Sequence, residues 1–210
     1  DPVFALAAVE SQQTAVVLGK LAPNVPRIGI SVRPWRGSGR CLREMAAAAD
    51  RLARELSAQI VLIPMYPATD LPACRELAGL LRVPPVIVEE ELKPQELLTV
   101  FARLDLVLAM RLHALVFAAK SGLPMVGIGY DPKVEAMLLR LGQARPLLPQ
   151  EITAGQLAAD ALAQWAGREK TSRHLREASS LAAQDARRLA GDVMELIISK
   201  GSGRAGRCNQ

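Results

Sequence analysis

Short apolar runs alternate with helical segments along most of this chain, and this alternation constrains the fold more than any other feature. The apolar runs are 27–32, 59–64, 85–88, 106–110 and 125–129, with a further candidate at 146–148. Helical spacing predicts helices near 42–57, 70–82, 94–104, 112–121, 133–141, 153–165 and 173–199. Crossover helices cover both faces of a parallel sheet, so its strands read as continuous apolar runs. We therefore predict an α/β fold with a doubly wound, mostly parallel, Rossmann-like sheet and closing C-terminal helices.

The same pattern divides the chain into four segments. Residues 1–25 are expected to form a lead-in helix or linker from an N-terminal domain that is missing here, because the sequence starts at Asp1 without an initiator methionine. Residues 26–150 should form the Rossmann-like domain, and residues 151–200 the closing helices. Residues 201–210 have too little apolar character to pack, and we expect them to be disordered.

Composition narrows the classes of partner. Half of the residues are hydrophobic but only 3% are aromatic, so the base-stacking platforms of nucleic-acid-binding proteins are scarce and no nucleic-acid partner is expected. The net charge of +5 suits anionic partners and serves solubility equally well. The three cysteines show no C-x-x-C spacing, which favours a reducing, cytoplasmic setting and gives no metal site. Without an apolar run of about 18 residues, at most peripheral membrane contact is expected.

The segment 105–119 carries the strongest functional signal. An apolar strand runs into a helix whose first residues include Arg111 and His113. In open α/β sheets, ligands bind at the carboxyl ends of the strands, where helix N-termini offer unpaired N–H groups. Two residues apart on a regular helix, these side chains would diverge, so at least one must lie in the preceding turn. A histidine at this position can also cap the helix or pack.

The loop after the first strand, residues 33–40, is a second candidate. Gly37 and Gly39 let backbone approach a ligand, and Arg33, Arg36 and Arg40 could bind oxyanions. A flexible surface loop explains the same composition.

The segment 130–133, Tyr-Asp-Pro-Lys, is the third candidate. Asp131 is a good N-cap and Pro132 suits the first helical position. Lys133 then falls in the first turn, where the helix dipole disfavours a cation, as it does at Arg111. These two cations suggest that an anion compensates them at one edge of the sheet, although solvent screening is the alternative.

The strings D-L-V-L-A-M-R-L-H-A-L-V-F-A, from residue 105, and P-M-V-G-I-G-Y-D-P-K-V, from residue 124, closely resemble the C-terminal half of polysaccharide pyruvyl transferases of the CsaB type. The string I-S-V-R-P-W at 30–35 is similar to the first strand and loop of that half. Together these matches extend over about residues 27–140.

The resemblance implies the second, donor-binding domain of a two-domain, GT-B-like enzyme. Such enzymes transfer a pyruvyl group from phosphoenolpyruvate to two sugar hydroxyls, forming a ketal with release of phosphate and needing no cofactor. A lipid-linked, ManNAc-containing cell-wall precursor is the acceptor it implies, at the inner face of the membrane, with a role in anchoring surface-layer proteins. By the same resemblance His113 is the catalytic acid or base, and the expected substrate-binding residues are Lys133, Arg111, Arg33 and Asp131.

Two other functions stay open from the residues alone. A GT-B glycosyltransferase using a nucleotide sugar needs a carboxylate for the ribose hydroxyls, which Glu89, Glu90 or Glu91 could supply. A non-catalytic domain could use His113 and Lys133 only to hold an anion.

Overall fold

The computed structural model describes residues 1–35, 38–129 and 131–202, without the side chains of residue 38 and residues 195–202. Within these residues, five parallel strands form one sheet in the order β3-β2-β1-β4-β5. The strands are β1 (Arg27–Ser31), β2 (Gln59–Leu62), β3 (Val86–Ile87), β4 (Leu106–Ala109) and β5 (Met125–Gly127). The predicted α/β class and parallel sheet are confirmed. The candidate strand at 146–148 is reduced to a single bridge between Ile128 and Leu147.

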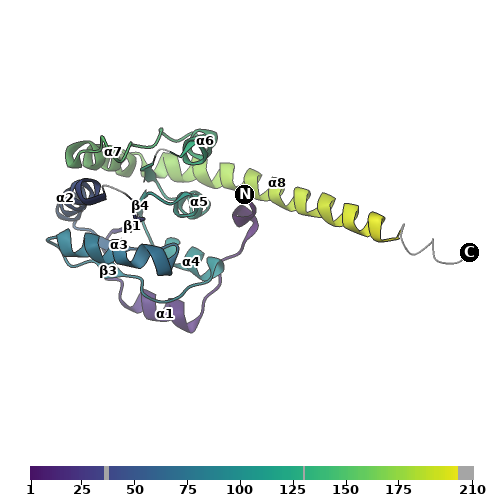
Figure 1. Cartoon of the computed structure of the whole chain (residues 1–210), viewed down its shortest axis with the longest axis horizontal. Coiled ribbons are helices and arrows are strands. Elements are labelled where there is room, and N and C mark those ends of the chain that lie inside the picture. Colours follow the sequence, from purple (N-terminus) through teal and green to yellow (C-terminus); the bar gives the residue numbers. More distant parts are fainter. Residues whose placement is uncertain (36–37, 130, 203–210) are drawn as a thin grey trace, which may run out of the picture.

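The helices follow the strands in alternation, as predicted. They are α1 (Gln12–Gly19), α2 (Ser38–Leu56), α3 (Pro67–Leu80), α4 (Pro94–Phe101), α5 (Leu112–Lys120), α6 (Pro132–Arg140), α7 (Ala154–Ala166) and α8 (Arg168–Ser202), after a 3-10 turn η1 (Pro2–Ala5). Helix α8 begins before the expected residue 173. In Figure 1 its C-terminal part extends away from the other elements.

Two apolar layers cover the two faces of the sheet. Along β1, Ile28 and Ile30 point into the layer formed by α2, α3 and α7, because successive side chains of a strand alternate between faces. In the next strand, Val61 points into the opposite layer, which contains α4 and α5. Burial on both faces explains why each strand reads as an uninterrupted apolar run.

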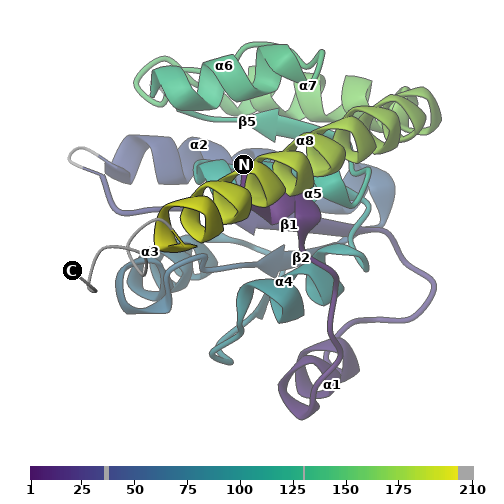
Figure 2. The same cartoon turned by 90° about the vertical axis from the view of Figure 1, so that its right-hand side faces the viewer.

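The lead-in segment packs against the core. Phe4 of η1 is buried in the same layer as α5 and α8, and its carbonyl oxygen accepts a hydrogen bond from Lys120 Nζ at 2.6 Å. Figure 2 shows α8 crossing in front of α5 and this N-terminal turn. Residues 203–210 of the expected disordered tail lie outside the described residues, and residues 201–202 end α8.

Helix α3 starts earlier than the predicted residue 70. Pro67 occupies a first-turn position with its φ preset, and Tyr66 is the N-cap. The Asp70 carboxylate turns back to accept the Tyr66 backbone N–H at 3.1 Å. Asp70 therefore lies inside the first turn, and its side chain points toward the carboxyl edge of the sheet.

Candidate functional site

A cavity of about 200 Å³ opens at the carboxyl ends of the strands. Its lining comes from the segments after β1, β2, β4 and β5, and comprises Arg33, Trp35, Tyr66, Met110, Arg111, Leu112, His113, Ile128, Gly129, Asp131 and Val134. The prediction that the segments after the first, fourth and fifth strands meet is confirmed. The contribution of the segment after β2 was not predicted.

Arg111 and His113 reach the cavity because the chain changes conformation between them. Arg111 is the N-cap of α5, with an extended backbone at φ −92° and ψ 129°, and the helix proper starts at Leu112. His113 is therefore in the first turn while Arg111 precedes it. This is the arrangement that the sequence required for both side chains to face one ligand.

The Arg111 guanidinium is held by a buried carboxylate. Its Nε lies 3.0 Å from Asp70 Oδ2, and its Nη2 also contacts Asp70 Oδ1. The Asp70 side chain is fully buried and that of Arg111 is 20% exposed. The anion that the sequence suggested for this cation is thus Asp70 itself, so an unsatisfied charge at Arg111 is not evidence for a ligand.

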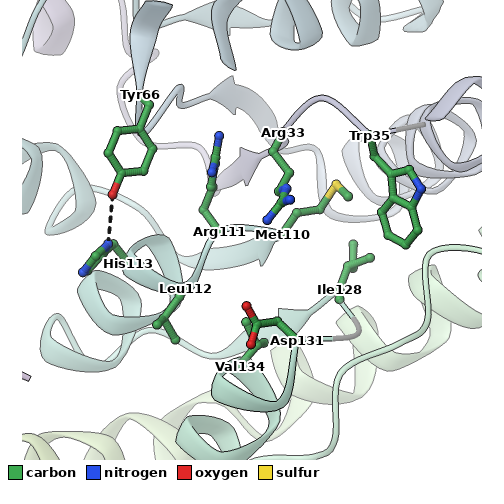
Figure 3. Close-up of a pocket in the computed structure, with 11 residues that line it drawn as sticks. Arg33, Trp35, Tyr66, Met110, Arg111, Leu112, His113, Ile128, Asp131 and Val134 are labelled. Carbon is green, nitrogen blue, oxygen red and sulfur yellow. Dashed lines mark hydrogen bonds between the residues drawn. The ribbon is translucent and has the colours of Figure 1, made fainter. Parts of the chain in front are cut away.

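Tyr66 links this ion pair to the histidine. The Arg111 guanidinium lies 4.9 Å from the centroid of the Tyr66 ring, and the Tyr66 hydroxyl lies 3.4 Å from His113 Nδ1. The other ring nitrogen, Nε2, lies 3.6 Å from Asp1 Oδ2. Figure 3 shows the Tyr66 hydroxyl directed at the imidazole, on the same side of the cavity as Arg111.

Arg33 differs from Arg111 in its partners. Its guanidinium lines the cavity and has no hydrogen-bond or ion-pair partner among the residues the structure describes. Figure 3 shows it pointing into the space between Arg111 and Asp131. A partly buried guanidinium with free N–H groups can bind a carboxylate or phosphate through two parallel hydrogen bonds.

The other basic residues of the loop after β1 do not join the cavity. Arg40, on α2, donates to the carbonyl oxygens of Gln150 at 2.5 Å and Ile152 at 3.3 Å. It fixes the loop before α7, and it is not among the residues that line the cavity. Arg36 and Gly37 lie outside the described residues, and Gly39 is part of α2.

The segment 130–133 contributes Asp131 but not Lys133 to the lining. Asp131 Oδ1 accepts the Lys133 backbone N–H at 2.9 Å, which confirms the predicted N-cap, and Pro132 is the first residue of α6. Lys133 is exposed in the first turn and does not line the cavity. Its predicted binding role stays a prediction, and Tyr130 is outside the described residues.

The carboxylates proposed for a nucleotide ribose lie elsewhere. Glu89 pairs with Arg75 at 2.9 Å and Glu90 with Lys20 at 2.5 Å. Neither they nor Glu91 line the cavity. No group of three or more metal-ligating side chains occurs among the described residues, and none of their helices is long and apolar enough to cross a membrane.

Asp70 and Tyr66 were missed by the sequence analysis. The signal available was their place directly after the second strand, since parallel strands all end at one edge. Chain order does not reveal that β4 pairs with β1, which is what brings the segment after β4 near Tyr66.

Comparison with protein-family models gives one match, over residues 1–132, to the family described as polysaccharide pyruvyl transferase. A comparison with curated protein sequences found no match.

Solved structures share the fold at low sequence identity. E. coli ADP-heptose lipopolysaccharide heptosyltransferase II is 16% identical, with a TM-score of 0.59, and the match covers 77% of this chain and 53% of that one. S. aureus MnaA, in a co-structure with UDP, is 13% identical, with a TM-score of 0.61, covering 90% and 49%. Anabaena HepE in complex with UDP-glucose is 16% identical, with a TM-score of 0.58, covering 95% and 55%. The chain spans about half the length of these structures, and its sheet corresponds to one Rossmann-like half of a GT-B fold.

Proposed function

Because the chain belongs to the polysaccharide pyruvyl transferase family, we propose that it forms the donor-binding half of an enzyme that transfers pyruvyl from phosphoenolpyruvate to a saccharide. The observation that carries this proposal is the cavity itself. It combines the guanidinium of Arg33, which has no partner among the described residues, with the imidazole of His113 at the carboxyl edge of the sheet. An anion-binding group and a proton-transfer group are the two elements that this reaction needs from the protein.

The chemistry assigns a task to each group. Two saccharide hydroxyl oxygens bond to C2 of phosphoenolpyruvate, and its bond to the phosphate oxygen breaks. One hydroxyl proton ends on the methylene carbon, which becomes a methyl group, and the other ends on the departing phosphate. His113 transfers the proton, because imidazole is the side chain that gains and loses a proton near neutral pH. Arg33 binds the phosphate or the carboxylate of the donor.

The other predicted site residues surround Arg33 and His113. Arg111 is held by Asp70, and its guanidinium forms part of the cavity wall that the donor contacts. Asp131 keeps the start of α6 in place through its cap. Lys133, in the first turn of α6 between the lining residues Asp131 and Val134, binds the donor phosphate. The motif resemblance supports these roles for Lys133 and Asp131.

The carboxylates suggested for a nucleotide ribose do not support a nucleotide-sugar donor. Glu89 pairs with Arg75 and Glu90 with Lys20, and neither they nor Glu91 line the cavity. Together with the family match, this makes the glycosyltransferase alternative the weaker one.

We further propose that a second Rossmann-like half supplies the acceptor side, since this chain spans about half of each matched structure. The resemblance to the CsaB type supports a lipid-linked, ManNAc-containing acceptor handled at the inner face of the membrane. The ketal product would then serve to anchor surface-layer proteins.

Phosphate release from phosphoenolpyruvate tests the catalytic assignment. In the complete enzyme with a saccharide acceptor, His113→Ala should lower the rate of release by at least about 100-fold, within the range for general acid–base catalysis. His174→Ala is the control, because His174 is the other histidine of the sequence and contacts Leu141 outside the cavity.

Binding of phosphoenolpyruvate to this chain alone completes the test. If the chain binds the donor and His113→Ala leaves release unchanged, the site is an anion-binding site and the catalytic proposal is wrong. If UDP-sugars bind in preference to phosphoenolpyruvate, the glycosyltransferase alternative holds.

A further inference from the structure

Tyr66 stands out as a large aromatic side chain that is half exposed at a functional edge. Tyr66 has 50% of its surface exposed, lines the cavity and directly precedes α3. Three contacts hold this residue. Its backbone N–H donates to Asp70, its ring packs under Arg111, and its hydroxyl reaches His113.

His113 has two polar neighbours. The Asp1 carboxylate lies 3.6 Å from Nε2, beyond hydrogen-bond distance, whereas the Tyr66 hydroxyl lies within hydrogen-bond distance of Nδ1, at 3.4 Å. A hydroxyl can both donate and accept. It donates where Nδ1 carries the lone pair and accepts where Nδ1 is protonated, so Tyr66 can hold the ring in both protonation states.

Contacts with Asp70 and Arg111 fix the position of Tyr66. Asp70 is fully buried and binds both the Arg111 guanidinium and the Tyr66 backbone. Arg111 in turn lies over the Tyr66 ring. These contacts form a closed set that leaves the phenol little freedom to leave the imidazole.

We propose that Tyr66 is the positioning residue of His113, fixing the orientation of the imidazole at the edge of the cavity through its hydroxyl contact with Nδ1. The inference rests on the proposed function, because it assigns to Tyr66 the preparation of the proton-transfer group. It adds the segment after β2 to the proposed active site. The Asp70–Arg111 ion pair then serves to hold Tyr66 beside His113, in addition to stabilising the fold.

Imidazole spectroscopy tests the positioning on this chain without any reaction. The sequence holds two histidines, His113 and His174, so ¹⁵N-edited NMR gives two assignable rings. In Tyr66→Phe, the Nδ1 shift of His113 should move because its hydrogen-bond partner is lost, while the shifts of His174 stay unchanged. Unchanged His113 shifts in Tyr66→Phe would overturn the proposal.

Kinetics in the complete enzyme separate the hydroxyl from the ring. Tyr66→Phe keeps the ring under Arg111, so kcat should fall about tenfold, a part of the general acid–base contribution, with KM for phosphoenolpyruvate within twofold. Tyr66→Leu also removes the ring, and KM should then rise as well. Ser179→Ala is the matched control, since it removes a buried hydroxyl bonded to Ala119 at the opposite end of α5.

The outcomes distinguish the two levels of proposal. If His113→Ala abolishes transfer but Tyr66→Phe has the activity of the wild type, the positioning role is wrong and the function stands. If His113→Ala is active, the proposed function fails. The NMR spectra of Tyr66→Phe still show whether the Tyr66 hydroxyl contacts His113. An equal loss in Ser179→Ala and Tyr66→Phe would mean that both act through stability, and would also overturn the positioning role.

Discussion

Replacing Asp70 with asparagine isolates the charge of the buried pair beneath the cavity. The substitution keeps the size of the side chain but removes its negative charge and places an N–H₂ group where one carboxylate oxygen was. In the native protein that carboxylate accepts from Arg111, from the Tyr66 backbone at 3.1 Å and from the Thr69 hydroxyl at 3.0 Å. Asparagine can satisfy only some of these donors.

The expected loss of stability follows from burial. Breaking a buried ion pair by removing one partner costs about 3–5 kcal/mol. The Arg111 side chain is 20% exposed, so water can solvate it in part, and we expect a loss of about 2–4 kcal/mol. For a domain of this size that corresponds to a fall in Tm of roughly 4–16 °C. Urea denaturation followed by circular dichroism measures the free energy of unfolding directly.

A double-mutant cycle with Arg111→Met assigns the loss to the pair. Asp70→Asn and Arg111→Met should together cost less than the sum of the single changes, with a coupling energy of about 1–3 kcal/mol. Asp50→Asn is the control, because Asp50 is also buried but accepts from the backbone N–H groups of Arg82 and Val83. Its cost should add to that of Arg111→Met within about 0.5 kcal/mol. A coupling below that value for Asp70 would refute the reasoning.

Two further experiments test the role of Arg33 in the cavity and the burial of Cys74 in the core. Arg33→Met should weaken phosphoenolpyruvate binding about 10- to 100-fold in calorimetry, because one charge-assisted contact is lost. Arg40→Met is the control and should change the affinity less than twofold, because Arg40 donates to two backbone carbonyls outside the cavity. Equal losses in the two variants would contradict the assignment of Arg33. The Cys74 thiol should resist iodoacetamide at pH 8 in the folded chain and react in urea, since burial, followed by the nearby Asp70 charge, raises its pKa to about 12. Peptide mass spectrometry measures this labelling, and equal rates in both states would show that Cys74 is not protected.

The sequence was sufficient to predict the layers of the fold. The apolar runs of β1, β4 and β5 were found because both faces of each strand are buried, and this leaves a continuous hydrophobic signature. Strand ends were overestimated by one or two residues, as at Ile63 and Met110, which are buried just beyond their strands. Burial continues past the last ladder hydrogen bond, so composition alone cannot mark that boundary.

The site was predicted in part, and the gaps have physical causes. Arg33, Arg111, His113 and Asp131 line one cavity because all parallel strands end at the same edge. The order of strands across the sheet depends on long-range packing, and so the place of Tyr66 beside His113 was not visible. The partner of Arg111 was missed for a similar reason: it follows β2, which is separated from β4 by β1.

The strand order also determines which side chains can meet across this edge of the sheet. Tyr66 follows β2 and His113 follows β4, and these strands flank β1 on either side. Neighbouring strands lie about 4.8 Å apart, so the two segments leave the sheet roughly 10 Å apart. The long tyrosine side chain spans this interval and reaches the imidazole at 3.4 Å, a reach that a smaller residue at position 66 would lack.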